Sequence, residues 1–316
     1  MRGVVPPKPA RPVFRGVRGV VPPKPAGPGG GPLLDSALLR QLELLTLDGL
    51  AAAMSVLEGE HAGAIRAQFA EPTDYRSYQS GDDPRLIDWN AYARLDELFV
   101  RTSDAHEGLT LTLLVDCSRS MAVPASGKLW HAKRLAAAFG VVALLHSDAV
   151  RVCAAAGGTA RPLPVLSGRT AVGVLLDELE WLPTGGDTGL AGSVRASRLD
   201  AAGPGFTVLL SDLLAAAEDV VEAVDLLGPH GTVLHVIDPA DADPAPGAPP
   251  GSAIELRDAE TGEVVTATLT PALRRRYLER FEGRRAELSA RCAAAGVRYV
   301  RADTTTAVGD LMFGSV

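Results

Sequence analysis

The sequence contains few cysteines and no long apolar run, and both absences narrow the class of protein. Its 316 residues include three cysteines, at positions 117, 153 and 292, without Cys-x-x-Cys spacing. A sparse, odd set of this kind provides no disulfide framework and is typical of a reducing compartment. No apolar stretch approaches the roughly 18 residues that a transmembrane helix needs, and the N-terminus has no apolar signal-peptide core. We therefore expect a cytoplasmic protein without a membrane span.

Basic charge and paired histidines are also scarce. The formal net charge is −7 and the pI about 5.4, whereas binding to nucleic acid phosphates needs a basic surface. The six histidines form no His-Glu-x-x-His motif or other ligand pair, so we interpret His131, His146 and His235 as satisfied structural histidines. The glycines of residues 185–189 are not followed by Gly-Lys-Ser/Thr, which excludes a P-loop. Nucleic acid is therefore not an expected partner.

The composition divides the chain into three parts. Residues 1–32 are a Pro/Gly-rich tail in which residues 2–10 recur identically as residues 18–26. This composition cannot form a packed core, so we predict disorder; a proline-motif ligand, a recent duplication and a misassigned start codon all remain open. Residues 33–108 are predicted to be an N-terminal helical segment, and residues 109–312 an α/β domain.

In the N-terminal segment, leucines and alanines recur at helical spacing over residues 33–57, with Asp35 and Ser36 as candidate N-caps. Pro84 after Asp83 predicts a helix over residues 84–94, and residues 98–102 are expected to form a strand.

Beyond residue 108, predicted strands alternate with predicted helices. The expected strands cover residues 109–115, 149–155, 206–210, 232–237 and 297–301. The expected helices cover residues 128–146, 170–180, 190–197, 215–227 and 271–295, and a hairpin is expected at residues 254–256 and 264–269. Almost continuously apolar strands indicate a sheet buried on both faces. Together these patterns predict an α/β fold with a doubly wound, mostly parallel sheet.

Oxygen-bearing side chains gather at one edge of this predicted sheet. The residues are Asp116, Ser118, Ser120, Thr188 and Asp212. Ligands of such sheets bind at the carboxyl ends of the strands, where we place these residues. Two carboxylates and three hydroxyls favour Mg²⁺, with Mn²⁺ or Ca²⁺ as alternatives. Because only two of the five donors are charged, a carboxylate from a partner can complete the shell; the alternative is that the strand-end aspartate and its serines only cap the next helix.

Several other polar groups are interpreted as structural. Lys128 and Lys133, at the start of the helix that follows, are expected to be solvated. The Cys117 side chain is expected to pack inward. The arginine-rich helix over residues 271–295 is expected to be solvated and laced with i,i+3 and i,i+4 ion pairs, with one face in the core. That face comprises Tyr277, Phe281, Leu288 and Cys292.

Two motifs resemble known families. The sequence Asp116-Cys-Ser-Arg-Ser120-Met121, taken with Thr188 and Asp212, resembles the metal ion-dependent adhesion site (MIDAS) of von Willebrand factor A domains. The motif RxYxxGDDPRxIDW at residues 76–89 is similar to the signature of the bacterial DUF58 family. The family usually has a Gly-x-Glu-Phe-like stretch before it, where this chain has Phe69-Ala-Glu71-Pro72, so the conformation entering the motif is expected to differ.

The resemblance implies a Rossmann-like domain that holds a metal at the five residues named above. It also implies a partner, because DUF58 members are often encoded beside MoxR-type AAA+ ATPases. We therefore expect a metal-dependent adaptor or co-chaperone rather than an enzyme. A magnesium-dependent hydrolase or phosphatase and a scaffold with a vestigial metal site are the alternatives. The signature motif itself is interpreted as a structural clasp, with a docking surface as the second possibility.

Overall fold

The computed structural model describes residues 31–43, 75–77, 99–101, 110–123, 127–145, 148–199, 205–243 and 245–313. Several predictions lie outside these residues. They concern the tail apart from its last two residues, the helix over 84–94, the continuation of the first helix beyond residue 43, and most of the RxYxxGDDPRxIDW motif. Within the predicted N-terminal segment, β1 (Tyr75–Ser77) pairs antiparallel with β2 (Phe99–Arg101), which confirms the strand expected near residue 100.

A mostly parallel sheet forms the centre of the fold, as predicted. Five strands run parallel in the order β11 (Arg298–Asp303), β8 (Gly231–Ile237), β7 (Gly205–Ser211), β3 (Thr110–Asp116) and β4 (Ala149–Ala156). Beyond β4, the short strands β5 (Thr159–Pro162) and β6 (Leu166–Ser167) pair antiparallel with it. These two edge strands were not predicted, because runs of four and two residues carry no recognisable periodicity.

The order of the strands places a switch point between β3 and β7. The chain first moves from β3 to β4 and β5, then crosses back to add β7, β8 and β11 on the other side of β3. The loops leaving β3 and β7 therefore diverge, and the crevice between them at the carboxyl ends is where doubly wound sheets bind ligands. All of β8 and nearly all of β3 are buried because helices cover both faces of the sheet.

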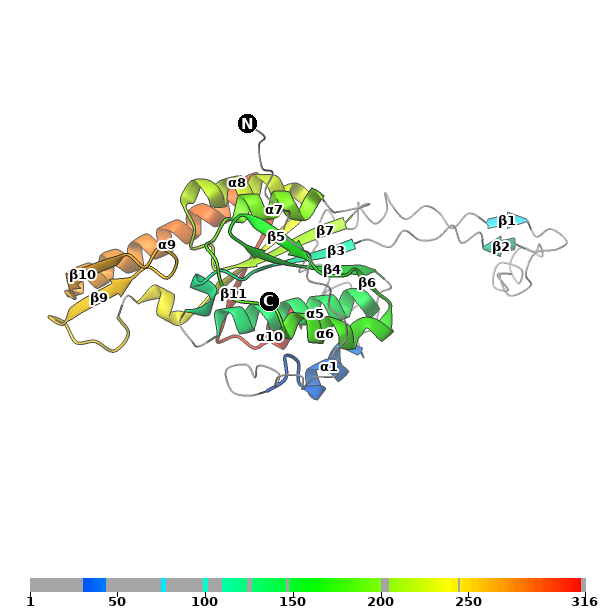
Figure 1. The fold of residues 1–316 in the computed structure, drawn as a ribbon, viewed down its shortest axis with the longest axis horizontal. Helices are drawn as coiled ribbons and strands as arrows, with labels where there is room; N and C mark the ends of the chain where they lie inside the picture. Colours follow the sequence, from blue (N-terminus) through cyan, green and yellow to red (C-terminus); the bar gives the residue numbers. More distant parts are fainter. Residues whose placement is uncertain are drawn as a thin grey trace, which may run out of the picture.

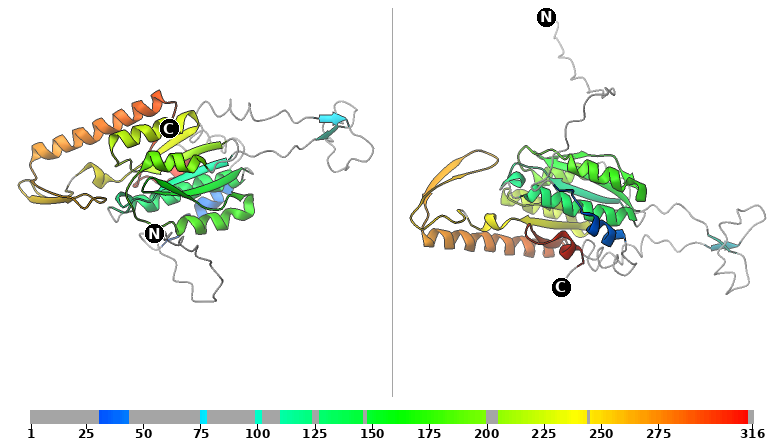
Figure 2. Two further views of the ribbon diagram at one scale, coloured as in Figure 1. Left: turned by 45° about the horizontal axis from the view of Figure 1, so that its top comes forward. Right: turned by 90° about the horizontal axis from the view of Figure 1, so that it is seen from below.

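Helices pack on both faces of the sheet (Figure 1). One apolar core lies under α5 (Lys128–Leu145) and α6 (Val172–Glu180), and it includes residues of α1 (Ser36–Glu43) and α10 (Val308–Phe313), which lie against α5. The second core lies under α7 (Leu190–Leu199), α8 (Ala217–Leu227) and α9 (Pro271–Ala294). The views in Figure 2 show the same layers from other sides. Helix α10 was not predicted, since its six residues are too few for a periodic pattern.

The first helix begins as its sequence predicts. Asp35 Oδ1 accepts hydrogen bonds from the backbone N–H groups of Ala37 (2.9 Å) and Leu38 (2.8 Å), so Asp35 caps α1. Leu38 and Leu42 are buried against the same core as α5. This helix, assigned from sequence to a separate N-terminal segment, thus contributes to the core of the α/β domain.

Helix α9 and the hairpin of β9 (Ala253–Arg257) and β10 (Val264–Thr268) extend past the sheet (Figure 1). The core face predicted for α9 is right for Leu288 and Cys292, which are buried. It is wrong for Tyr277, which is exposed, and only partly right for the half-buried Phe281. The amino-terminal part of α9 lies where the sheet no longer offers a surface. No helix among the described residues is both long and apolar enough to cross a membrane.

Helix α7 approaches the turn between β4 and β5 so closely that Gly192 has no room for a side chain. A Cβ at Gly192 would lie 2.5 Å from the carbonyl oxygen of Gly158. We expect Gly192→Ala to lower the free energy of unfolding by about 2 kcal/mol, because the helix must shift. At Gly173 in α6, no described atom lies within 4 Å of the Cβ position, so Gly173→Ala should raise stability by about 0.5 kcal/mol. Urea unfolding of both variants checks this, and a loss of similar size in both would contradict it.

Candidate functional site

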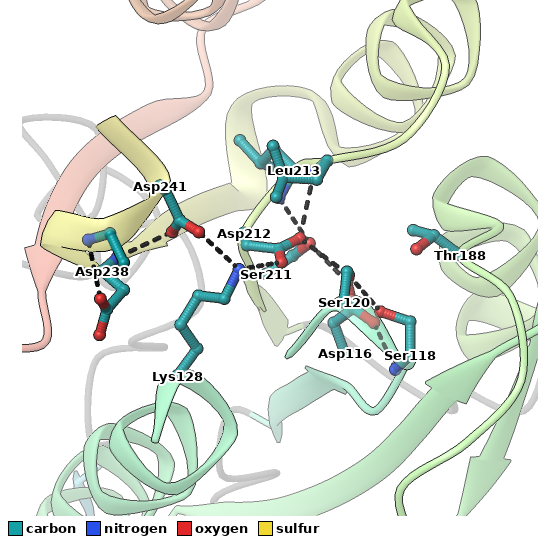
Figure 3. A network of polar contacts seen from close by, with 12 residues as sticks. Asp116, Ser118, Ser120, Lys128, Thr188, Ser211, Asp212, Leu213, Asp238 and Asp241 are labelled. Atoms are coloured by element: carbon teal, nitrogen blue, oxygen red, sulfur yellow. Dashed lines mark hydrogen bonds and ion pairs between the residues drawn. The ribbon is translucent and has the colours of Figure 1, made fainter. Parts of the chain in front are cut away.

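The loop after β3 brings polar side chains together in the crevice (Figure 3). Asp116 is the last residue of β3, and its Oδ1 accepts a hydrogen bond from the Ser118 N–H at 2.9 Å. The hydroxyls of Ser118 and Ser120 lie 3.0 Å apart, and the Ser120 hydroxyl donates to Asp212 Oδ1 at 3.3 Å. All four side chains are buried. We call Asp116, Ser118, Ser120 and Asp212 the strand-end cluster; the sequence predicted its members to converge, and they do.

The end of β7 closes the cluster from the other side. The Ser211 hydroxyl donates to Asp116 Oδ2 at 2.6 Å and accepts from the Leu213 N–H at 3.0 Å, so neighbouring strands are joined through side chains. Leu213 has a φ of 54°, a left-handed conformation that costs a branched residue about 1 kcal/mol or more. Arg284 of α9 donates to the carbonyls of Leu213 (3.0 Å) and Ala215 (2.5 Å) and thereby holds this loop. The expectation that the arginines of α9 are solvated is therefore wrong for Arg284, whereas the exposed Arg275–Glu279 pair follows it.

The fifth predicted residue, Thr188, stands apart from the strand-end cluster in Figure 3, and among the described residues it bonds to a different group. Its glycine-rich loop is fastened to the loop after β3, because the Gly185 N–H donates to the Cys117 carbonyl (2.8 Å) and the Arg119 N–H to the Gly186 carbonyl (3.2 Å). The Thr188 N–H and hydroxyl both donate to the carboxylate of Glu260, the N–H at 2.8 Å. Nothing in the sequence pointed to Glu260, which lies 72 residues further along the chain.

Lys128 is buried, so the prediction that it is solvated is wrong. Its ammonium lies 2.8 Å from Asp212 Oδ2 and 3.1 Å from Asp241 Oδ1 (Figure 3). Burial alone would lower the pKa of Lys128, but the two carboxylates outweigh it and raise that pKa above its usual value. Its carboxylate partners lie 84 and 113 residues away, which is why the helix start gave no sign of them.

Lys133 is also buried, against the same prediction. Its ammonium donates to the carbonyls of Leu182 (2.9 Å) and Glu180 (3.2 Å), where α6 ends. Burial lowers the pKa of Lys133, since its hydrogen-bond acceptors are neutral. It therefore fastens α6 to α5 rather than facing solvent.

Asp116 carries a negative charge that the cluster compensates poorly. Burial and then the neighbouring Asp212 carboxylate raise the pKa of Asp116 to about 6, although Ser211 and Ser118 donate hydrogen bonds to it. Within the described part of the chain, the ammonium of Lys128 pairs with Asp212 and Asp241, not with Asp116. An ionised, buried carboxylate without a cation is costly, so the site favours an additional positive charge.

The donors of the strand-end cluster fit a hard divalent cation in kind and in charge. They are carboxylate and hydroxyl oxygens, the ligands that Mg²⁺ prefers, and the charge they lack is positive. Among the described residues, no group of three or more His, Cys, Asp or Glu side chains is placed to hold a metal ion. A cation here therefore depends on the serine and threonine hydroxyls as well as on the two aspartates.

The remaining polar groups near the site are structural. His235 Nε2 lies 3.0 Å from the carbonyl oxygen of Asp212, which can only accept, so Nε2 carries the proton and Nδ1 accepts from the Tyr299 hydroxyl at 2.6 Å. Burial lowers the pKa of His235 to about 4, which keeps the ring neutral. Cys117 packs inward as predicted, and burial raises the pKa of its thiol to about 12.

Of the other two histidines interpreted as satisfied, His146 lies outside the described residues. His131 is buried, but its Nε2 has no hydrogen-bond partner within the described part of the chain, so that interpretation is wrong for this atom.

A doubly wound, mostly parallel sheet with helices on both faces defines an α/β domain. The chain belongs to the DUF58 family, because the family model described as "Protein of unknown function DUF58" matches residues 74–287. Uncharacterized proteins of Mycobacterium bovis and Mycobacterium tuberculosis are 30% identical to this chain over 263 residues, which is 80% of both chains.

The solved structures to which this chain is similar include those of three bacterial proteins. The conserved hypothetical protein BatB from Bacteroides thetaiotaomicron has a TM-score of 0.41 and 24% identity, over 62% of this chain and 91% of that one. An aerotolerance-related membrane protein from Bacteroides fragilis has a TM-score of 0.39 and 21% identity, over 65% and 96%. A von Willebrand factor type A protein from Catenulispora acidiphila has a TM-score of 0.38 and 14% identity, over 65% and 40%.

Proposed function

We propose that this protein is a metal-dependent protein-binding module whose bound cation recruits a carboxylate of its partner. The cation would be Mg²⁺, or Mn²⁺ or Ca²⁺ in its place, and the residues holding it are Asp116, Ser118, Ser120, Thr188 and Asp212. The observation that supports this most directly is the buried strand-end cluster, in which Asp116 faces Asp212 and two hydroxyls without an ammonium of its own.

Each donor would have a distinct role. Asp116 would supply a negative charge that Lys128 does not neutralise, and the Ser118 and Ser120 hydroxyls would add neutral oxygens that do not repel the cation. Asp212 has only Oδ1 to offer, directly or through water, because Lys128 engages Oδ2. When bound, the metal supplies a positive charge that these donors neutralise incompletely, which is what attracts a partner's Asp or Glu.

The surroundings of the cluster favour binding over catalysis. Asp116, whose pKa is about 6, is proposed as a metal ligand, and a nucleophile or general base would have to be another group poised near neutral pH. Cys117 is a buried thiol with a pKa of about 12, and His235 is held neutral between Tyr299 and the backbone of Asp212. We therefore propose that the chain is not an enzyme. On the family resemblance, we propose a MoxR-type AAA+ ATPase or its client as the partner; this partner and the cytoplasmic location stay predictions.

Calorimetric titration with Mn²⁺ and Mg²⁺ tests the metal site. We expect the wild-type chain to bind one divalent cation and Asp116→Ala to lose this binding, because one of the two charged ligands proposed here is gone. Glu263→Ala is the matched control, since Glu263 is an exposed acid in the hairpin turn and should leave the affinity unchanged. A wild-type chain that binds neither cation would make the site vestigial.

Pull-down with a purified MoxR-type ATPase, in Mg²⁺ or in EDTA, tests the partner. We expect retention of wild type in Mg²⁺ only and no retention of Asp116→Ala. Unchanged retention of that variant would show that the metal is not the docking point. A screen of phosphoesters with and without Mg²⁺ completes the test, because magnesium-dependent turnover would instead indicate a hydrolase.

A further inference from the structure

The turn between β9 and β10 reaches back to the site and is fastened there at two points. Glu260 presents its carboxylate to the N–H (2.8 Å from Oε2) and the hydroxyl of Thr188. The backbone carbonyl of Glu260 accepts a hydrogen bond from Arg119 at 2.7 Å, and Arg119 lies in the loop between the two serines of the strand-end cluster. The same turn therefore contacts the loop after β3 and the loop before α7, which are two of the three loops that carry the proposed metal ligands.

Hydrogen bonds within the turn hold the backbone of Glu260 in this position. Asp258 Oδ1 accepts hydrogen bonds from the N–H groups of Glu260 (2.9 Å) and Thr261 (2.7 Å), and the Gly262 N–H donates to the Asp258 carbonyl at 3.0 Å. Gly262 has a φ of 73°, a conformation that favours glycine. The strands on either side pair over five residues. Glu260 is thus presented from a closed turn, and little backbone freedom is lost when its carboxylate docks.

The carboxylate of Glu260 lies next to one of the proposed metal ligands. The N–H and the hydroxyl of Thr188 both donate to it. Because no three acidic side chains among the described residues are placed to hold a metal together, Glu260 would reach the cation beside Thr188 rather than as part of a ready-made carboxylate cluster. Arg119 contacts the Glu260 backbone rather than its carboxylate among the described contacts, and the ammonium of Lys128 is engaged by Asp212 and Asp241. A divalent cation bound beside Thr188 would attract this carboxylate, which is a ligand of the kind that Mg²⁺ and Mn²⁺ prefer.

We propose that Glu260 is an internal ligand of the metal site: its carboxylate fills, within the same chain, the coordination position offered to a partner. This inference rests on the proposed function. It identifies the kind of group that the site accepts, an acidic side chain presented from a tight turn. An incoming partner must then displace the hairpin turn, because an internal ligand competes at the millimolar effective concentrations typical of short tethers. Only molecules whose turn is undocked can bind a partner. The apparent association constant for the partner is therefore the intrinsic constant multiplied by the undocked fraction.

Binding of Mn²⁺ to the full chain, measured by calorimetry, tests the internal ligand. We expect Glu260→Ala and Glu260→Gln to weaken Mn²⁺ binding about tenfold, since both remove a charged ligand while glutamine keeps the size of the side chain. Glu263→Ala in the same turn should bind Mn²⁺ as wild type does. Hydrogen exchange gives a second readout that does not depend on affinity. Mg²⁺ should slow exchange of the Thr188 N–H and of residues 258–262 in wild type but not in Glu260→Gln.

The possible results separate this inference from the proposed function. Weaker Mn²⁺ binding in both Glu260 variants, with wild-type binding in Glu263→Ala and metal-dependent protection of the turn, supports the inference. If wild type binds Mn²⁺ and both Glu260 variants bind it equally well, Glu260 is not a ligand, although the metal site stands. Equal weakening by Glu260→Ala and Glu263→Ala would assign the effect to the overall charge of the turn and overturn the inference. A wild-type chain that binds no Mn²⁺ overturns the proposed function and this inference together.

Discussion

Lys128→Met is expected to lower the free energy of unfolding by about 3–5 kcal/mol, as is typical when one partner of a buried ion pair is removed. Methionine retains an apolar stem of similar length, so the loss isolates the ammonium. In wild type the ammonium lies 2.8 Å from the carboxylate of Asp212 and 3.1 Å from that of Asp241. In the variant, both carboxylates stay in the interior without a cation. The penalty arises from the charges left behind rather than from the contact itself.

Urea unfolding in EDTA measures this effect, and Lys133→Met is its matched control. Lys133 is a buried lysine of the same helix, but its acceptors are the neutral carbonyls of Glu180 and Leu182. Its loss should cost about 1–3 kcal/mol, because no charge is stranded. The double variant Lys128→Met/Asp212→Asn should recover part of the loss. If Lys128→Met costs no more than Lys133→Met, the buried pair does not stabilise the fold in the way described.

Asp116→Asn is expected to stabilise the metal-free protein at neutral pH. The folded-state pKa of Asp116 is raised to about 6 from 3.8, so between these values the folded state binds more protons than the unfolded state. The free energy of unfolding then falls as the pH rises through that window. At about 1.4 kcal/mol per pKa unit, the ionised carboxylate costs about 3 kcal/mol above pH 6 and nothing below pH 4. Asparagine has nearly the same shape and no charge, and therefore avoids this cost.

The difference in unfolding free energy between Asp116→Asn and wild type, measured in EDTA from pH 4 to 7, should grow by about 3 kcal/mol. The pKa values of His131 and His235 are lowered to about 4, so these two residues destabilise both proteins as the pH falls. The difference in unfolding free energy between variant and wild type cancels this shared effect. Saturating Mg²⁺ should raise the stability of wild type but not of the variant, which reduces the difference at pH 7. A difference that stays flat with pH would mean that Asp116 is not desolvated as the fold indicates.

The proximity of the predicted site residues follows from simple sequence signals. Asp116, Ser118 and Ser120 are neighbours in the chain, and their local spacing alone placed them in one loop. Placing Asp212 beside them needed one further inference. The carboxyl ends of neighbouring parallel strands meet at one edge of the sheet, and Asp212 follows such a strand. That step succeeded because β3 and β7 are apolar enough to be recognised and are adjacent in the sheet.

The contacts of the longer charged side chains, two lysines and one glutamate, were not predicted from the sequence. Lys128 and Lys133 resemble ordinary solvated lysines at the start of a helix, and Glu260 resembles an ordinary hairpin-turn acid. What distinguishes them is burial or a contact with groups many tens of residues away, such as Asp212 for Lys128 and Thr188 for Glu260. A long side chain carries the same local pattern whether it faces water or a buried carboxylate, so no periodicity could reveal these contacts.

The sequence by itself determined the α/β class, the main parallel strands and the residues at their carboxyl ends, because apolar runs and helix and turn signals are local properties. The tertiary structure decided which charges face one another. It alone placed the Lys128 ammonium between two carboxylates and brought the Glu260 turn onto Thr188. The physical reason is that electrostatic pairing depends on distance in space and on the exclusion of water, and both are set only when the distant segments pack.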